Sequence, residues 1–284
     1  MDRSSQPYRS ILYIPGSNAR AIEKSRNLAV DAIIFDLEDA VSPDAKIEAR
    51  ETLRQELAVG GFGPRRRIVR INGVDTQWGH DELAACAEMA PDAVLIPKVE
   101  SPDTIATVRA ALPEGEIAIW AMMETPKGIL NASAIAAAPG MEGFVMGTND
   151  LAKELGSRTR SAMLASLQTC LLAARAEGLI CVDGVYNAFK DEAGLRAECD
   201  EGRDMGFDGK TLIHPAQVAV TNGVFGISED ALELARRQIE ACELAEAEGK
   251  GVAVVDGKIV ENLHVETARH ILGQADVIAV LESV

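Results

Sequence analysis

The sequence lacks any arrangement of cysteines that could form a disulfide framework or a zinc site. Its 284 residues include five cysteines, an odd number, at scattered positions and without Cys-x-x-Cys spacing. Disulfide scaffolds and zinc sites require paired or closely spaced cysteines. We therefore expect all five thiols to be buried as small apolar side chains. They are Cys86, Cys170, Cys181, Cys199 and Cys242.

An excess of positive charge is also absent. Lys and Arg number 28 against 44 Asp and Glu, which gives a formal net charge of -16 at pH 7. A chain with this charge repels nucleic acid and anionic lipid surfaces. We expect no nucleic-acid partner, and any polyanionic ligand must be held by local clusters of Arg and Lys.

Long apolar runs are missing as well. No stretch approaches the roughly 18 consecutive apolar residues of a membrane span, and the opening residues, MDRSSQPYRS, contain no apolar signal core. We expect a cytoplasmic protein without a membrane partner. With 47% hydrophobic and 25% charged residues, the composition is typical of a globular chain.

The sequence does contain a repeated alternation of short apolar runs and amphipathic stretches. Eight apolar runs are typical of buried strands, at residues 10–15, 32–37, 67–72, 93–98, 117–123, 143–148, 179–184 and 210–215. Helical periodicity lies between them, at residues 44–57, 78–89, 101–111, 161–177 and 191–205. Eight strands alternating with helices favour a closed (β/α)₈ TIM barrel over an open doubly wound sheet.

The chain continues beyond the eighth strand. Residues 228–250 are typical of a long charged helix, and a hairpin-like segment at 252–261 and a last helix follow. We divide the sequence into a barrel domain, residues 1–225, and a C-terminal helix and lid segment, residues 226–284. Gly249 and Gly251 are expected to form a hinge, so the tail could close over an active site or pack beneath the barrel.

Polar side chains follow the apolar runs repeatedly. The ends of the predicted strands carry Asp36, Glu38, Asp39, Arg70, Lys98, Glu124, Asp150, Asp183 and His214. The active site of a (β/α)₈ barrel lies at the carboxyl ends of its strands, so these groups would converge although they are far apart in sequence. A single carboxylate could instead cap the next helix, but caps do not account for the whole set.

Glu124 and Asp150 follow consecutive strands and could share one hard divalent cation. Mg²⁺ is the natural candidate, because it binds one or two carboxylates and completes its octahedron with water and substrate oxygens. Mn²⁺ would fit the same ligands. The simpler alternative is that the two carboxylates form unrelated ion pairs.

Three cationic side chains could bind an anionic substrate. Arg70 ends the predicted strand RIVRIN, and its guanidinium could bind a carboxylate or thioester oxygen in bidentate fashion. Arg20 and Lys24 lie in the first turns of the helix after PGSN, where amides and cations could hold phosphates, although the same segment could be an ordinary turn and cap. His214 is interpreted as a hydrogen-bonding neighbour of the site rather than as a catalyst.

Seven motifs, in order along the chain, resemble the citrate lyase beta subunit-like enzymes of the HpcH/HpaI aldolase superfamily. The motifs are RSILYIPGSNARAIEKS, DAIIFDLEDAV, VRING, DAVLIPKVE, AMMETPKGILNA, MGTNDLAKELG and GKTLIHPAQV. The resemblance covers about residues 9–270. It implies a (β/α)₈ barrel that forms trimers or hexamers and binds an acyl-CoA and magnesium, with a C-terminal lid that helps to close a neighbouring site.

The resemblance implies roles for individual residues of this chain. Glu124 and Asp150 match the metal ligands of the family, and Arg70 matches its substrate-polarising arginine. Glu38 and Asp39 match the acidic pair after the second strand, which in relatives supports the arginine and the water on the metal. All five residues are present, so we expect a competent magnesium site.

Within the family, residues 183–215 and 251–269 look most like the malyl-CoA group, which contains lyases and a thioesterase. The thioesterase is the nearer match, which implies hydrolysis of (3S)-malyl-CoA to malate and coenzyme A, with Arg70 stabilising the oxyanion and Glu261 as general base. Lyase members carry a lid aspartate where this sequence has Glu261, and Asp256 is an alternative match for that acid. The other functions considered are cleavage to glyoxylate and acetyl-CoA, and a carrier-dependent citrate lyase beta-type subunit.

Overall fold

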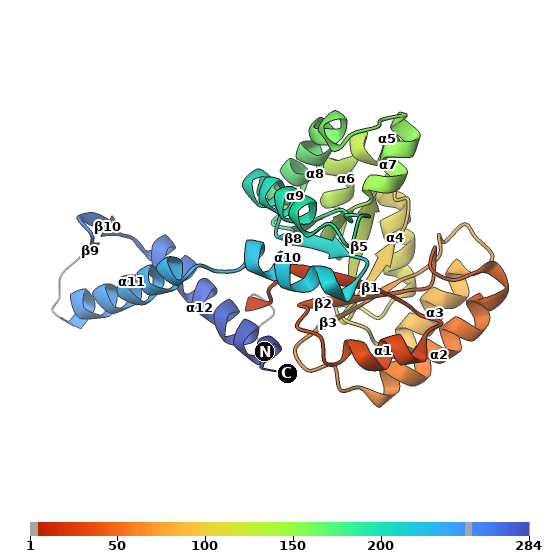
Figure 1. Ribbon diagram of the computed structural model, residues 1–284, viewed down its shortest axis with the longest axis horizontal. Coiled ribbons are helices and arrows are strands. Elements are labelled where there is room, and N and C mark those ends of the chain that lie inside the picture. Colours follow the sequence, from red (N-terminus) through yellow and green to blue (C-terminus); the bar gives the residue numbers. More distant parts are fainter. Residues whose placement is uncertain (1–4, 248–251, 284) are drawn as a thin grey trace. The chain divides into compact units, whose positions relative to one another are not determined.

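A closed barrel of eight parallel strands forms the centre of the unit that spans Tyr8–Phe225 (Figure 1). The computed structural model describes residues 5–247 and 252–283. The strands are β1 (Ser10–Pro15), β2 (Ala32–Asp36), β3 (Arg66–Arg70), β4 (Ala93–Ile96), β5 (Ala118–Met123), β6 (Met141–Met146), β7 (Ile180–Asp183) and β8 (Gly209–Leu212). They pair in sequence order, and β8 pairs with β1 to close the barrel. The (β/α)₈ barrel predicted from the sequence is therefore confirmed.

Helices surround this barrel (Figure 1). They are α1 (Ala19–Ser25), α2 (Lys46–Val59), α3 (Gly79–Met89), α4 (Pro102–Ala111), α5 (Pro126–Leu130), α6 (Ala132–Ala136), α7 (Thr148–Leu155), α8 (Leu164–Ala176), α9 (Glu192–Met205) and α10 (Val218–Phe225), with 3₁₀ turns η2 (Pro43–Ala45), η3 (Arg160–Met163) and η4 (Pro215–Gln217). The five helices expected from periodicity correspond to α2, α3, α4, α8 and α9. The short helices α5, α6, α7 and α10 were not predicted, because five to eight residues are too few to show a helical period.

Alternation along the strands divides the core into two layers. Outward-facing side chains such as Phe35 and Val69 pack between the barrel and its helices. Inward-facing side chains, among them Ile11 and Ile68, fill the barrel around Trp120, which is fully buried. At the amino ends of the strands, Arg66 and Glu142 form an ion pair, and Glu142 also accepts the indole N–H of Trp120. The other end of this packed interior, at the carboxyl ends of the strands, carries further polar groups.

The described residues before Tyr8 and those from Gly226 onward form a second compact unit. It contains α11 (Glu229–Ala247), the antiparallel strands β9 (Ala253–Val255) and β10 (Lys258–Val260), and α12 (Asn262–Glu282). The hairpin turns at Asp256 and Gly257, with φ angles of 50° and 75°, as a tight two-residue turn requires. The long helix and the hairpin expected from the sequence therefore form. The expected hinge at Gly249 and Gly251 lies outside the described residues, and the role of the unit as a lid stays a prediction.

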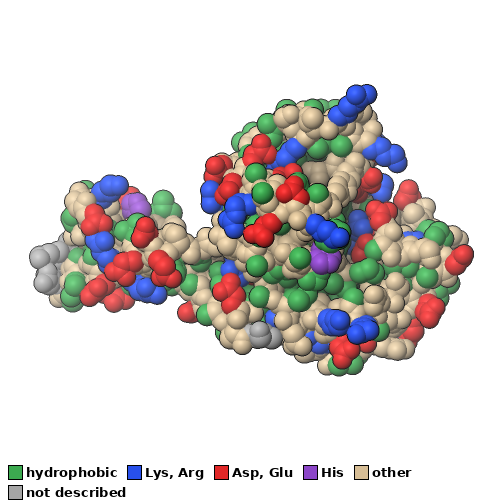
Figure 2. All heavy atoms as spheres, in the orientation of Figure 1, with side chains coloured by type: hydrophobic (Ala, Val, Ile, Leu, Met, Phe, Trp, Pro, Cys, Tyr) green, Lys and Arg blue, Asp and Glu red, His purple; other side chains and the backbone are tan. Residues whose placement is uncertain are grey.

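The charged residues counted in the sequence can be located on the surface of the molecule. Figure 2 shows acidic and basic side chains dispersed over the visible face of the barrel unit, with hydrophobic side chains between them. No helix in the described part of the chain has the length and apolar character needed to cross a bilayer.

Four cysteines are buried as expected, and burial raises the pKa of the Cys170 thiol to about 12. The expectation is wrong for Cys242, which is only partly buried because α11 buries few of its residues.

Candidate active site

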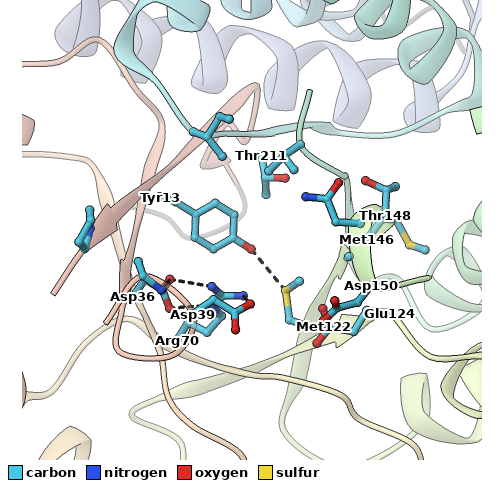
Figure 3. A pocket seen from close by; sticks show the side chains of 16 residues that line it. Tyr13, Asp36, Asp39, Arg70, Met122, Glu124, Met146, Thr148, Asp150 and Thr211 are labelled. Carbon is cyan, nitrogen blue, oxygen red and sulfur yellow. Dashed lines mark hydrogen bonds and ion pairs between the residues drawn. The ribbon is translucent and has the colours of Figure 1, made fainter. Parts of the chain in front are cut away.

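A pocket of about 390 Å³ opens at the carboxyl ends of the barrel strands (Figure 3). Its lining combines apolar and charged side chains from most of the barrel strands and the loops that follow them. The residues labelled in Figure 3 are Tyr13, Asp36, Asp39, Arg70, Met122, Glu124, Met146, Thr148, Asp150 and Thr211. Residues far apart in sequence therefore meet at the mouth of the barrel, as the closed topology requires.

Arg70, the last residue of β3, is held by carboxylates. Its Nε and Nη2 donate to the two carboxylate oxygens of Asp36 at 2.7 and 2.6 Å. Its Nη1 lies 2.9 Å from Glu38 Oε2 and 3.7 Å from Asp39 Oδ2. Burial alone would lower the pKa of Arg70, but the hydrogen bonds that it donates to Asp36 and the neighbouring negative charges raise it, so the guanidinium stays charged. Asp36 is thus the bidentate partner of this arginine. The other N–H groups of Nη1 and Nη2 remain available to a ligand.

Asp36 organises the loop after β2 as well as the arginine. Besides binding Arg70, its carboxylate accepts the backbone N–H groups of Glu38 at 2.9 Å and Ala40 at 3.0 Å. These bonds fold the FDLEDA segment around the carboxylate, and Glu38 is thereby brought to the same guanidinium. Sequence reasoning gave Asp36 no specific role. The available signal was a charged residue at the end of the apolar strand AIIFD.

Glu124 is a buried carboxylate just after β5, with 3% of its surface exposed. Its Oε1 accepts the backbone N–H of Lys98 at 2.8 Å. Burial raises the pKa of Glu124 to about 7, opposed by the Lys98 backbone and charge and reinforced by the negative charge of Glu38. A side chain at Gly147 would place its Cβ 2.4 Å from Glu124, so only glycine fits beside this carboxylate.

Lys98 joins the acidic residues of three loops. Its backbone has a φ of 50°, which costs a non-glycine residue roughly 1–2 kcal/mol. The strained backbone aims its N–H at Glu124, while its Nζ donates to Glu38 Oε1 at 2.9 Å and lies 3.4 Å from Asp150 Oδ2. From the sequence, Lys98 was only one polar residue among several at a strand end.

The carboxylates outnumber the cations in this cluster. The acidic members are Asp36, Glu38, Asp39, Glu124 and Asp150, and the cationic members are Arg70 and Lys98. No group of three acidic, His or Cys side chains in the described residues forms a complete metal cage. Mg²⁺ does not need one, because it binds one or two carboxylates and takes its other ligands from water and substrate. The hard oxygen donors and the surplus negative charge therefore fit a magnesium ion held by Glu124 and Asp150.

Arg20 and Lys24 do not line the pocket. Both side chains are exposed on α1, the short helix that follows β1. This helix begins after Asn18, whose Oδ1 accepts the backbone N–H of Ala21 at 3.0 Å. The cap is therefore supplied by Asn18, and phosphate binding by the two cations stays a prediction.

The two candidate lid acids belong to the C-terminal unit. Asp256 lies in the hairpin turn, where its carboxylate forms an ion pair with Arg237 of α11. Glu261 is exposed and precedes α12, and its backbone N–H donates to His264 Nδ1 at 3.0 Å. Asp256 thus has an ion-pair partner within its own unit and Glu261 has none among the described residues, and the role of either acid stays a prediction.

Two of the strand-end residues do not converge on the pocket as expected. Asp183 is fully buried and binds Arg160 and Lys210, because its side chain points away from the barrel interior. His214 is exposed rather than a neighbour of the site. Its Nδ1 accepts the backbone N–H of Ala216 at the start of η4, and its ring stacks on Phe189 with centroids 4.5 Å apart.

Comparisons with known proteins identify the family of the chain. The profile of the HpcH/HpaI aldolase/citrate lyase family matches residues 9–215. A (3S)-malyl-CoA thioesterase from Cereibacter sphaeroides is 61% identical over 98% of both chains, and an L-malyl-CoA/beta-methylmalyl-CoA lyase from the same organism is 31% identical over 97% of this chain and 96% of its own. The crystal structure of the protein CitE from Mycobacterium tuberculosis, in complex with magnesium, acetoacetate and coenzyme A, matches with a TM-score of 0.72 and 28% identity over 96% of this chain and 99% of that chain. The chain belongs to the HpcH/HpaI aldolase/citrate lyase family.

Proposed function

We propose that the chain is a magnesium-dependent thioesterase that hydrolyses (3S)-malyl-CoA to malate and free coenzyme A. The full-length similarity to proteins named for this activity supports the substrate and the reaction. The geometric observation that carries the proposal is the pocket in which Arg70, held by carboxylates, faces Glu124 and Asp150 (Figure 3). This arrangement offers one subsite for a carbonyl oxygen and another for a cation that binds a hydroxy acid.

Glu124 and Asp150 are the residues that would hold Mg²⁺, or Mn²⁺ in its place. When bound, the ion supplies positive charge that offsets the carboxylates and attracts the hydroxyl and carboxylate oxygens of the malyl group. Lys98 already contacts Asp150, and its backbone N–H orients Glu124. The chain thus keeps both acidic ligands in place through one neighbouring residue.

Arg70 is assigned the thioester end of the substrate. Asp36 and Glu38 fix the plane of its guanidinium, so the N–H groups that remain can meet a carbonyl oxygen without reorganisation. Water adds to the thioester carbon while a carboxylate accepts the proton from the water, and we assign this general base to Glu261. Asp39 is exposed on the pocket rim, where it can support the incoming water. The carbon–sulfur bond then breaks, and coenzyme A leaves as a thiolate that takes up a proton.

The coenzyme A portion requires cations outside the pocket. Arg20 and Lys24 are exposed on the helix after β1, on the side of the barrel where the strands end. We assign them to the phosphates of coenzyme A, because local cations must capture a polyanion against the net negative charge of the chain. Salt would weaken this contact more than it weakens the buried ion pairs.

We propose a cytoplasmic homotrimer or homohexamer in which the C-terminal unit supplies Glu261 to a neighbouring site. The proposal follows from the implied family architecture and from an exposed Glu261 without a described ion-pair partner. Sedimentation velocity measures the number of subunits. The contribution of one subunit to the site of another is tested by mixing two inactive variants, Glu261→Gln and Asp150→Asn. Activity regained on mixing would support a shared site, and a mixture without activity would exclude it.

The reaction itself is tested by following free thiol and glyoxylate separately in one assay with malyl-CoA and magnesium. We expect thiol release to dominate, since the extra methylene of Glu261 relative to aspartate shifts the carboxylate by about 1 Å, and such shifts can cost about 100-fold in rate. Glu261→Asp should raise glyoxylate relative to thiol, and Glu261→Gln should depress both products. Glyoxylate and acetyl-CoA as the main wild-type products would refute the thioesterase proposal.

A further inference from the structure

Tyr13 places a phenol in the pocket to which the mechanism above gives no task. Side chains alternate along β1, so Ile11 and Tyr13 share its inward face. Ile11 belongs to the inner core, and Tyr13 packs partly buried on that core. The phenol lines the pocket together with Arg70 and Met122. In Figure 3 its hydroxyl points into the space between Arg70 and Glu124.

The hydroxyl of Tyr13 has only a weak hydrogen-bond acceptor. Its Oη donates to Met122 Sδ at 3.4 Å, and thioether sulfur accepts hydrogen bonds weakly. Among the described residues, no oxygen or nitrogen atom accepts this proton. A partly buried donor in this state gains when a ligand oxygen replaces the weak acceptor. The neighbouring Asp36 and Arg70, in contrast, satisfy each other.

The charged surroundings keep the phenol protonated. Burial raises the pKa of Tyr13, and the carboxylates of Asp36, Glu124 and Glu38 reinforce that shift against the opposing charge of Arg70. The guanidinium carbon of Arg70 lies 5.0 Å from the centre of the Tyr13 ring, a cation–π contact that couples the positions of the two side chains. Tyr13 therefore acts as a fixed hydrogen-bond donor and not as a base.

Arg70 alone offers incomplete stabilisation for a developing anion. Asp36 occupies the fork formed by Nε and Nη2, and Glu38 lies beside Nη1. Oxyanion sites act through preorganised donors aimed at the position where charge develops. We propose that the Tyr13 hydroxyl is a catalytic residue, the second oxyanion donor beside Arg70, and that it hydrogen-bonds the thioester oxygen as water adds to the adjacent carbon. This inference rests on the proposed hydrolysis.

The step balances without a change in the protonation of Tyr13. As the water oxygen bonds to the thioester carbon, the electron pair of the carbonyl bond moves to the thioester oxygen, and Tyr13 and Arg70 donate hydrogen bonds to it. When the carbonyl bond re-forms, the carbon–sulfur bond breaks and its electron pair leaves with the thiolate. Tyr13 keeps its proton throughout, so the wild-type rate should not fall at the ordinary pKa of tyrosine, about 10.

The test compares Tyr13→Phe with a matched control, Tyr8→Phe. The first change removes the pocket hydroxyl and keeps the ring beneath Arg70. Tyr8 lies before the start of β1, packs against Trp120 with ring centroids 5.3 Å apart in a tilted arrangement, and does not line the pocket, so Tyr8→Phe controls for removal of a barrel hydroxyl. We expect Tyr13→Phe to lower kcat about 100-fold, as loss of one oxyanion donor does, with KM little changed. Tyr8→Phe should keep the wild-type kcat.

Measuring the binding of a substrate analogue distinguishes a role of Tyr13 in the transition state from a role in binding the substrate. The probe is a thioether analogue of malyl-CoA in which a methylene group replaces the thioester carbonyl, measured by calorimetry with magnesium present. Tyr13→Phe should bind this analogue as tightly as wild type, because the analogue lacks the oxygen assigned to Tyr13. A wild-type kcat in Tyr13→Phe, or weaker binding of the analogue that accounts for the lost rate, would overturn the inference. Absence of thiol release by the wild-type protein would instead remove the proposed function and this inference with it.

Discussion

Asp36 and Asp183 each end a barrel strand and each bind an arginine, yet they belong to different kinds of charged cluster. Asp36 lines the pocket, where its partner Arg70 retains N–H groups for a ligand. Asp183 is fully buried outside the pocket lining, and its two oxygens accept from Arg160 Nη1 at 3.0 Å and Nη2 at 2.9 Å. Asp36 thus positions a side chain of the pocket, whereas Asp183 binds side chains in the layer around the barrel.

The two clusters also differ in their charge balance. Around Asp183, the Lys210 ammonium is fully buried, donates to Asp183 at 3.0 Å and donates to Glu198 at 2.6 Å. Arg160 extends the same network to Glu201 on α9. Each ion there meets an opposite charge of the chain, with three carboxylates to two cations, whereas the pocket cluster has five carboxylates to two cations. The larger carboxylate surplus lies at the pocket, where it is suited to bind a cation.

The comparison predicts its largest effect at Asp150, an acid of the pocket cluster. Asp150→Asn should lower kcat/KM by more than 100-fold, since even losses in the outer shell of a metal site cost about 10- to 100-fold. The melting temperature should stay near that of wild type because the side chain is only partly buried. Asp103→Asn is a control, since Asp103 lies in the first turn of α4 as Asp150 does in α7, but is exposed and outside the pocket. Equal activity and magnesium affinity in Asp150→Asn would show that this acid is not a metal ligand.

At Asp183 we expect a smaller effect, and it should be on stability rather than on activity. Asp183→Asn leaves Lys210 and Arg160 without their shared carboxylate, and breaking a buried pair costs about 3–5 kcal/mol of unfolding free energy. Urea unfolding measures this loss, while the folded fraction should keep its kcat. The double variant Asp183→Asn/Lys210→Met should lose less stability than the sum of the single variants. Strict additivity, or a loss of kcat at full stability, would count against a purely structural network.

Sequence patterns predicted where the strands run but not the direction in which their last residues point. FDLED and VDGVY both read as a strand that ends in aspartate, and the strand positions were nearly correct because buried strands are short, continuous apolar runs. Successive side chains face opposite sides of a sheet, so one residue of register separates a pocket group from an outer one. The partner of Arg70, the left-handed backbone of Lys98 and the weak acceptor of Tyr13 depend on three-dimensional contacts that no spacing encodes.

The smallest expected effect is the pH dependence of magnesium affinity. It distinguishes a site that binds a cation from a network whose charges pair with each other. The pKa of Glu124 is raised to about 7 by burial, so without metal the carboxyl is increasingly protonated below that pH. Magnesium must then displace a proton, and its affinity should rise with pH below the pKa by up to about tenfold per unit and level off above it. Calorimetry between pH 6 and 8, in buffers of different ionisation enthalpy, measures the proton released. Magnesium affinity that does not change over this range would place the ion elsewhere.

Gly147 shows how a residue without any reactive atom can be as intolerant of change as an acid. Its Cα borders Glu124 so closely that an added methyl group would overlap both the Cβ and the Oε2 of that side chain, each at 2.4 Å. An alanine at this position would displace the carboxylate instead of removing it. In a library of random variants, every amino acid other than glycine would therefore be depleted at position 147. A survey based on invariance alone would assign this position a chemical role, although what it requires is empty volume.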